Sequence, residues 1–190
     1  MARTKIDRRI IKTKRALTTS LLQLMADKSI DEVTITELTQ LADVNRKTFY
    51  LHYTCIADVA SEINNRLSAE FIKAVSSAKT ETGFVPEKLF KALQQTIDED
   101  SEFFKAFCTK NASAYFLRLA EPLMFEQLTS GLQTAYPNAD ETLLHDTLVF
   151  VIAGCISLFF NWIRAQDERP LGEVMAVATK LSETELSALR

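Results

Sequence analysis

The first 82 residues of this 190-residue chain contain neither glycine nor proline. The whole chain holds only four of each, about a third of the usual joint share for its length. Sheet-rich folds need many turns, and turns depend heavily on these two residues, whereas helices need few of them. With 47% hydrophobic and 25% charged residues, the composition is otherwise that of a globular protein. The sequence therefore predicts an all-α protein.

The positions of the glycines and of the cysteines argue against several kinds of site. A phosphate-cradling loop needs clustered glycines, but the nearest two, Gly154 and Gly172, lie 18 positions apart. The three cysteines, Cys55, Cys108 and Cys155, are widely spaced and odd in number, which argues against a disulfide framework and a zinc site. We therefore expect neither a metal nor a cofactor.

Charge is unevenly distributed along the chain. Residues 1–15 carry a net charge of +6, residues 1–60 carry +3, and the remaining 130 residues carry −6. A basic amino end on an acidic body predicts a local contact with a polyanion, and the alternative is a solvated first helix. Because the basic segment has no apolar core of signal-peptide length, we expect a cytoplasmic protein.

Two short helices joined by a tight turn are predicted between residues 33 and 53. Thr34 and Glu37 have the T-x-x-E spacing of a capping box, so a helix should begin after Thr34. Asn45 is a good cap for the second helix. Asp43 lies where the chain must turn sharply, and Asp tolerates the left-handed conformation better than most residues.

A basic helix over about residues 7–27 precedes this pair, with apolar side chains recurring every three or four positions. Together the three helices form the helix-turn-helix pattern of DNA-binding proteins. Arg46 and Lys47 can donate to guanine acceptors or phosphates, and Thr48 can contact a thymine methyl. The alternative is a helical hairpin with solvated polar residues.

The segment VTITELTQLADVNRKTFYLHY, residues 33–53, resembles the DNA-binding signature of the tetracycline-repressor (TetR) family of bacterial transcriptional regulators. The matching positions are Thr34, Leu38, Ala42, Val44, Thr48, Tyr50, His52 and Tyr53. NRKTFYLHY is most similar to the subgroup related to the activator of dihydroxyacetone kinase operons, and the ending FFNWIRAQDERPLGEVM resembles the same subgroup. The resemblance implies a helix-turn-helix DNA-binding domain over residues 1–55. A helical effector-binding and dimerisation domain follows over residues 56–190, for about nine helices in total.

The resemblance also implies roles for individual residues. Phosphate contacts are expected from Thr34, Tyr50 and His52 and base contacts from Arg46, Lys47 and Thr48, while Thr36 and Asn45 complete the expected DNA-binding set and Tyr53 mainly packs. Two positions depart from the family pattern. Asp43 replaces a glycine at the turn, and Ile56 stands where a lysine usually meets a phosphate at the start of the fourth helix.

Beyond residue 55, helices are expected over about 56–79, 86–98, 101–109 and 112–134, with a loop at 80–86. Pro122 should break or kink the last of these. The region is rich in aromatic residues, which either form plain core or line an effector pocket such as the family encloses. The candidate ligand-binding residues are Phe103, Phe107, Tyr115, Phe116 and Arg118.

Residues 147–163 carry no charge. A membrane span normally needs about 20 apolar residues, so we expect instead a helix buried both in its own core and against a partner subunit. Residues 170–181 form a second apolar stripe, and the resemblance implies that both helices build a four-helix dimer interface. The expected interface residues are Leu148, Ile152, Phe159, Trp162, Val174 and Val177.

The leading hypothesis is a homodimeric regulator that binds a pseudo-palindromic DNA operator and is modulated by a small molecule or a partner at its C-terminal domain. The alternative is a co-regulator of the same fold that acts through protein contacts with weak or no DNA binding, motivated by Asp43 and Ile56. An enzyme is not expected, because nothing near the pair His52 and Cys55 is placed to orient a base. Binding to a membrane is not expected either.

Overall fold

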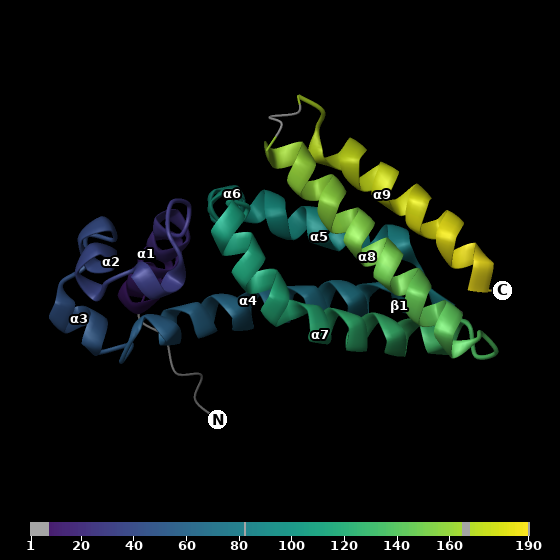
Figure 1. Ribbon diagram of the computed structural model, residues 1–190, viewed down its shortest axis with the longest axis horizontal. Helices are drawn as coiled ribbons and strands as arrows, with labels where there is room; N and C mark the ends of the chain where they lie inside the picture. The colour runs from purple at the N-terminus through teal and green to yellow at the C-terminus, as the bar shows by residue number, and fades with distance from the viewer. Residues whose placement is uncertain (1–7, 82, 165–167, 190) are drawn as a thin grey trace. The chain divides into compact units, whose positions relative to one another are not determined.

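The computed structural model describes residues 8–81, 83–164 and 168–189, so Arg3, Lys5 and Asp7 of the basic amino segment lie outside the described residues. Helices dominate the described part (Figure 1). In chain order the elements are α1 (Arg8–Leu24), η1 (Ile30–Glu32), α2 (Ile35–Leu41), α3 (Arg46–Tyr50), α4 (Ile56–Ala78), β1 (Lys79–Thr80), β2 (Gly83–Phe84), α5 (Pro86–Glu99), α6 (Ser101–Phe107), α7 (Lys110–Ala135), α8 (Glu141–Arg164), α9 (Leu171–Leu186) and η2 (Ser187–Leu189). The expected all-α fold of about nine helices is confirmed.

The chain divides into two compact units. One comprises Met1–Arg66 and Glu102–Leu117, and the other comprises Leu67–Ser101 and Arg118–Arg190. The long helices α4 and α7 therefore each contribute to both units. These units are defined by contacts within the chain. The expected division at residue 55, between a DNA-binding domain and an effector-binding and dimerisation domain, stays a prediction.

The first unit contains the helix-turn-helix. α1 packs against α2, and α2 packs against α3. Leu17 and Leu21 of α1 recur four residues apart and are fully buried, as are Leu38 of α2 and Phe49 of α3. Side chains four apart lie on one face of a helix, so α1 presents a continuous apolar face to the two short helices.

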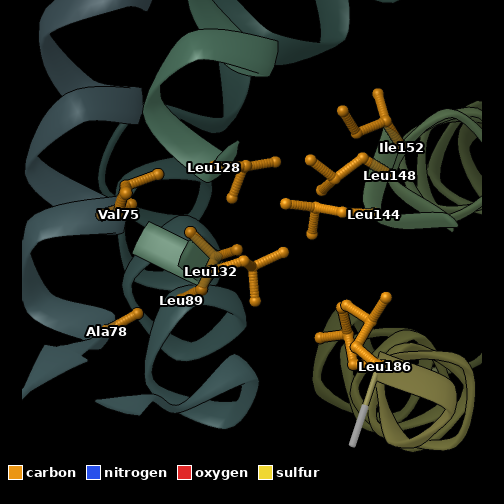
Figure 2. Packing of buried hydrophobic residues seen from close by; sticks show 11 residues of the cluster. Val75, Ala78, Leu89, Leu128, Leu132, Leu144, Leu148, Ile152 and Leu186 are labelled. Atoms are coloured by element: carbon orange, nitrogen blue, oxygen red, sulfur yellow. The ribbon is translucent and has the colours of Figure 1, made fainter. Parts of the chain in front are cut away.

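The second unit has a core to which five helices contribute side chains (Figure 2). Its buried members include Val75 and Ala78 of α4, Leu89 of α5, Leu128 and Leu132 of α7, Leu144, Leu148 and Ile152 of α8, and Leu186 of α9. α9 lies against both α5 and α8. The three α8 residues recur every four positions, which defines the face of α8 that this core covers.

Two details differ from the sequence-based expectation. The stretch expected as a loop contains a small antiparallel pairing, in which Lys79 lies opposite Phe84 and Thr80 lies opposite Gly83. Gly83 has φ 133°, a conformation that favours glycine.

The second detail concerns α7, which was expected over about residues 112–134 and runs as one helix with Pro122 inside it. Proline at this position leaves the carbonyl of Arg118 without its usual intrahelical donor. The helix nonetheless continues through Pro122 as one element, so the expected break is absent and the expected kink stays a prediction.

Within the described residues, α8 is the one helix that is long and apolar enough to cross a membrane by length and composition. Its most apolar 18-residue window has a mean hydropathy of 2.0, and 17% of that window is buried within the chain. A core helix of a soluble protein can be equally long and apolar, but most of its surface is then expected to be buried by the rest of the chain. α8 therefore carries apolar surface that one copy of the chain leaves uncovered.

Candidate nucleic-acid interface

The start of α2 is fixed by a capping box. The Thr34 side chain accepts a hydrogen bond from the Glu37 backbone N–H at 3.2 Å, and the Thr34 backbone N–H donates to Glu37 Oε2 at 3.0 Å. Lys28 Nζ lies 2.6 Å from Glu37 Oε1. The Lys28 hydrogen bond and then those of Thr34 lower the pKa of Glu37 to about 2. The expected capping box is therefore present and holds an ionised carboxylate.

The turn between α2 and α3 centres on Asp43, which has φ 52°. The chain reverses tightly there, since the Val44 backbone N–H donates to the Thr39 carbonyl at 2.9 Å. This is the left-handed conformation expected of that position, where the family pattern has glycine. Because Asp43 has a Cβ, this conformation is sterically less favourable for it than for glycine.

α3 is a short helix that is anchored by a single buried side chain. Asn45 Oδ1 accepts from the Lys47 backbone N–H at 2.8 Å and so caps the helix. Phe49 is 0% exposed, and it is the residue that attaches α3 to the rest of the unit. The other side chains of α3 are therefore left to face outward or sideways.

The eight expected DNA-binding residues all retain accessible surface. Those that are exposed are Thr34, Thr36, Asn45, Arg46, Lys47 and Tyr50, and those that are half-buried are Thr48 and His52. All eight belong to α2, α3 or their immediate flanks, so they lie in one compact unit. Tyr53 is buried, in agreement with its expected packing role.

Internal hydrogen bonds limit what two of these residues can offer. The Thr34 hydroxyl donates to Glu37 Oε2 at 2.8 Å, so its proton is already used. The Asn45 carboxamide oxygen is likewise used by the cap of α3. Bidentate recognition of adenine needs both the oxygen and the amide nitrogen of an asparagine. In this conformation one lone pair of the Asn45 oxygen is already used, which restricts how the side chain can orient toward a base.

A carboxylate accepts the backbone N–H groups that precede α4. Asp58 Oδ2 accepts the backbone N–H groups of Thr54 and Cys55 at 2.6 and 3.2 Å. These hydrogen bonds, that of Thr54 first, lower the pKa of Asp58. A negative group thus occupies the helix start at which Ile56 replaces the family lysine. Lys28, which could have supplied a substitute charge, is paired with Glu37.

Four of the five expected ligand-binding residues are aromatic and lie in the first unit, while Arg118 belongs to the second. Phe103, Phe107 and Phe116 are buried. Phe107 and Phe116 have ring centroids 6.3 Å apart, and Arg66 Cζ lies 3.9 Å from the Phe103 ring centroid. Tyr115 is half-buried and Arg118 is exposed. Two hollows on the described surface, one on α8 and one beside β2, are lined by other residues.

The expected dimer-interface residues fall into two groups. Leu148, Ile152 and Val174 are buried within the chain's own cores, so their surface is already covered in a single copy. Phe159 and Trp162 are half-buried and stack at a centroid distance of 6.1 Å, and Val177 is exposed. The large apolar side chains that α8 exposes are Leu143, Val149 and Phe150, none of which was among the expected interface residues. No three His, Cys, Asp or Glu side chains in the described ranges are grouped to hold a metal ion.

Known structures share this architecture. The chain superposes on the dihydroxyacetone kinase operon activator DhaS with a TM-score of 0.59 and 15% identity, over 94% of this chain and 98% of that one. A TetR-family transcriptional regulator from Streptomyces coelicolor gives a TM-score of 0.55 and 18% identity, over 94% of this chain and 86% of that one. The protein thus has the fold of the TetR-family regulators, and the resemblance found in its sequence is confirmed.

Sequence comparison points in the same direction. A segment of 89 residues is 32% identical to the uncharacterized HTH-type transcriptional regulator YxbF of Bacillus subtilis (strain 168). This match covers 46% of the present chain but 23% of YxbF, so the chain spans less than a quarter of that relative's length. No protein-family model matches the chain.

Proposed function

We propose that this protein is a transcriptional regulator of TetR type that binds a pseudo-palindromic DNA operator as a homodimer in the bacterial cytoplasm, and that it is not an enzyme. The observation that supports this most directly is the outer surface of α3. There Arg46, Lys47 and Tyr50 are exposed on a capped helix that Phe49 anchors. Two such helices in a dimer would enter successive major grooves about 34 Å apart.

The test is selection of bound duplexes from a random DNA pool by the purified protein at near-physiological salt. Enrichment of an inverted repeat is the expected result. A folded, dimeric protein that enriches no sequence would overturn the proposal. The salt concentration matters, because the phosphate contribution to affinity falls steeply as salt rises.

Alanine variants then separate base contacts from phosphate contacts. Arg46→Ala and Lys47→Ala should each weaken binding to the selected site by about 1–3 kcal/mol while leaving binding to random duplexes nearly unchanged. A uniform loss on all sequences would instead assign that side chain to a phosphate. The matched control is Lys73→Ala, which removes an exposed cation from α4 outside the helix-turn-helix.

The proposed dimer forms through α8 and α9, which lie side by side (Figure 1). Phe150 of α8 is 64% exposed, and a shallow apolar hollow next to it is lined by Asp146, Val149, Phe150, Ala153, Gly154 and Ser157. A Cβ built on Gly154 meets nothing within 4 Å, so another helix can approach closely there. Val177 and Leu181 of α9 are exposed as well. Such apolar surface marks an interaction site in a soluble protein.

We also propose that a small molecule or a partner acts on the part of the chain after residue 55. Such an effector would change DNA affinity only if it bound the two states of the dimer with different affinity. The aromatic residues Phe103, Phe107, Tyr115 and Phe116 of the first unit remain the candidates for its site. Titration of the protein–DNA complex with candidate compounds, followed by fluorescence anisotropy, would test this.

The second candidate function is a co-regulator that keeps the fold but works through protein contacts. The Asp58 carboxylate favours it, because this group holds the N–H donors that precede α4 and would repel a phosphate there. The candidate predicts little DNA affinity for the protein alone. It is separated from the first by the duplex selection, since a co-regulator enriches no inverted repeat.

A further inference from the structure

The face of α3 that points away from the rest of the unit is the one opposite its buried side chain, Phe49. Helical geometry continues past Tyr50, since Leu51 has φ −74° and ψ −19° and the Phe49 carbonyl accepts from the N–H groups of His52 and Tyr53, both at 2.9 Å. Residues two before and two after a given residue lie on the opposite side of a helix with 3.6 residues per turn. Lys47 and Leu51 therefore lie opposite Phe49, next to each other.

Leu51 is 78% exposed, which makes it the most exposed large apolar side chain in the described part of the protein. Its position on α3 gives it no role in packing, since Phe49 on the opposite side supplies the anchor. The neighbour that shares its outward surface is cationic: Lys47 lies one turn earlier and is exposed. A leucine next to an exposed cation can bind a polyanion that also carries an apolar group, because the cation contacts the charge and the leucine contacts the apolar group.

The DNA major groove presents such a combination. Phosphates line its edges, guanine offers acceptors that lysine can bind, and thymine carries the one apolar group, its C5 methyl. We propose that Leu51 determines specificity by contacting a thymine methyl beside the base pair that Lys47 contacts. This inference rests on the proposed function and adds a residue that the family pattern leaves unspecified.

The flanking residues fit the same orientation of α3. Arg46 and Tyr50 lie on one side of the Lys47–Leu51 line, and Thr48 and His52 lie on the other. Thr48 and His52 are half-buried, so they cannot extend as far from the surface as Leu51. With Lys47 and Leu51 deepest in the groove, Tyr50 on one flank and His52 on the other are placed toward the two phosphate backbones.

The experiment uses the duplex that the wild-type protein selects from the random pool. Each thymine of one half-site is replaced in turn by deoxyuridine, which removes the methyl and nothing else. For the wild-type protein, one replacement should weaken binding about fourfold, since burying a methyl-sized group contributes about that factor. For Leu51→Ala the same replacement should have no effect. Leu51→Met, which keeps an apolar contact, should keep the wild-type pattern.

The matched control is Leu41→Ala, which truncates another exposed leucine, at the end of α2, and should leave the deoxyuridine pattern unchanged. Circular dichroism checks that each variant is folded. If the wild-type protein selects a duplex but no thymine shows an effect that depends on Leu51, the inference is wrong while the proposed function stands. If no duplex is selected, the proposed function fails and the inference fails with it.

Discussion

The Tyr53 hydroxyl donates a 2.8 Å hydrogen bond to Glu62 Oε2, nine residues further along in α4. Lys14 Nζ of α1 lies 2.6 Å from the same oxygen and 5.4 Å from the centre of the Tyr53 ring. Burial first, and then the Glu62 carboxylate, raise the pKa of Tyr53 above its ordinary value, so the hydroxyl keeps its proton. One carboxylate thus ties α1 and the segment after α3 to α4.

Removing that hydroxyl should destabilise the helix-turn-helix. We expect Tyr53→Phe to lower the free energy of unfolding by about 1–2 kcal/mol, because a hydrogen bond to a charged group is lost while the ring still packs. Urea denaturation measures the change. Tyr50→Phe is the control, since its ring is exposed and the expected change is within about 0.5 kcal/mol. Equal losses in the two variants would contradict a structural role for the Tyr53–Glu62 bond.

The capping box should make stability depend on pH. The pKa of Glu37 is lowered from 4.5 to about 2 in the folded protein. Its contribution is therefore fully present above the unfolded value and is lost as pH falls from about 4.5 toward 2. We expect the difference in unfolding free energy between the wild-type protein and Glu37→Gln to be largest near neutral pH and to shrink in acid.

A second variant tests the cause of that shift. Lys28→Met keeps the aliphatic stem but removes the charge that lies 2.6 Å from Glu37. It should raise the pKa of Glu37 toward its ordinary value, as followed by NMR titration of the side-chain carboxyl. A Glu37 titration that stays unchanged in Lys28→Met would assign the shift to the Thr34 hydrogen bonds alone.

The turn at Asp43 offers a stabilising substitution. Asp43→Gly should raise the free energy of unfolding by about 0.5–1 kcal/mol, because glycine adopts a φ of 52° without steric cost. Asp43→Val should destabilise, since a β-branched residue is strongly disfavoured there. Thermal denaturation ranks the variants. The control is Gln40→Gly within α2, which should cost about 1 kcal/mol. A loss at both positions would show that backbone entropy outweighs strain at Asp43.

The exposed and buried faces of α8 should respond differently to substitution. Phe150→Glu should convert dimers to monomers without unfolding the chain, as measured by analytical ultracentrifugation. Leu148→Ala should instead cost about 2–5 kcal/mol of stability, because that side chain is fully buried. Ser76→Glu, which adds the same charge at an exposed site of α4, serves as the control. A wild-type protein that is monomeric, or that partitions into lipid vesicles, would overturn the proposed use of this face.

Restoring the family lysine tests the departure at the start of α4. Ile56→Lys should strengthen binding to all duplexes and steepen the dependence of log affinity on log salt by about 0.9 per subunit, the value for one added phosphate contact. Ile56→Met is the matched control and should change neither quantity. An unchanged slope in Ile56→Lys would place this helix start away from the DNA backbone.

Several features of this protein could be predicted because their causes are local. The Thr34–Glu37 capping box, the Asn45 cap and the left-handed Asp43 each depend on residues within a few positions of one another. The β1–β2 pairing was not predicted, because two-residue strands are too short to show a period. For α7 the sequence predicted a helix over about residues 112–134 that Pro122 breaks or kinks, and the helix runs unbroken through Pro122.

The charged and polar residues of the candidate site were named from the sequence, whereas Leu51 was proposed only from the structure. Leu51 was not singled out from the sequence, although its spacing of two from Phe49 and four from Lys47 places it opposite Phe49 on a helix. What was missing was the knowledge that Phe49 alone is buried in α3. The exposure of Leu51 follows from that one fact.

By itself the sequence determined the helices, their caps and the helix-turn-helix, since these follow from short-range hydrogen bonding and from the periodicity of apolar residues. Only the tertiary structure decided which apolar side chains of α8 are covered. Leu148 and Ile152 face the core, while Val149 and Phe150 next to Leu148 do not. A helix that is apolar nearly all round has no pattern that distinguishes its faces, so the choice is made by the core cluster that α8 shares with residues of α4, α5, α7 and α9.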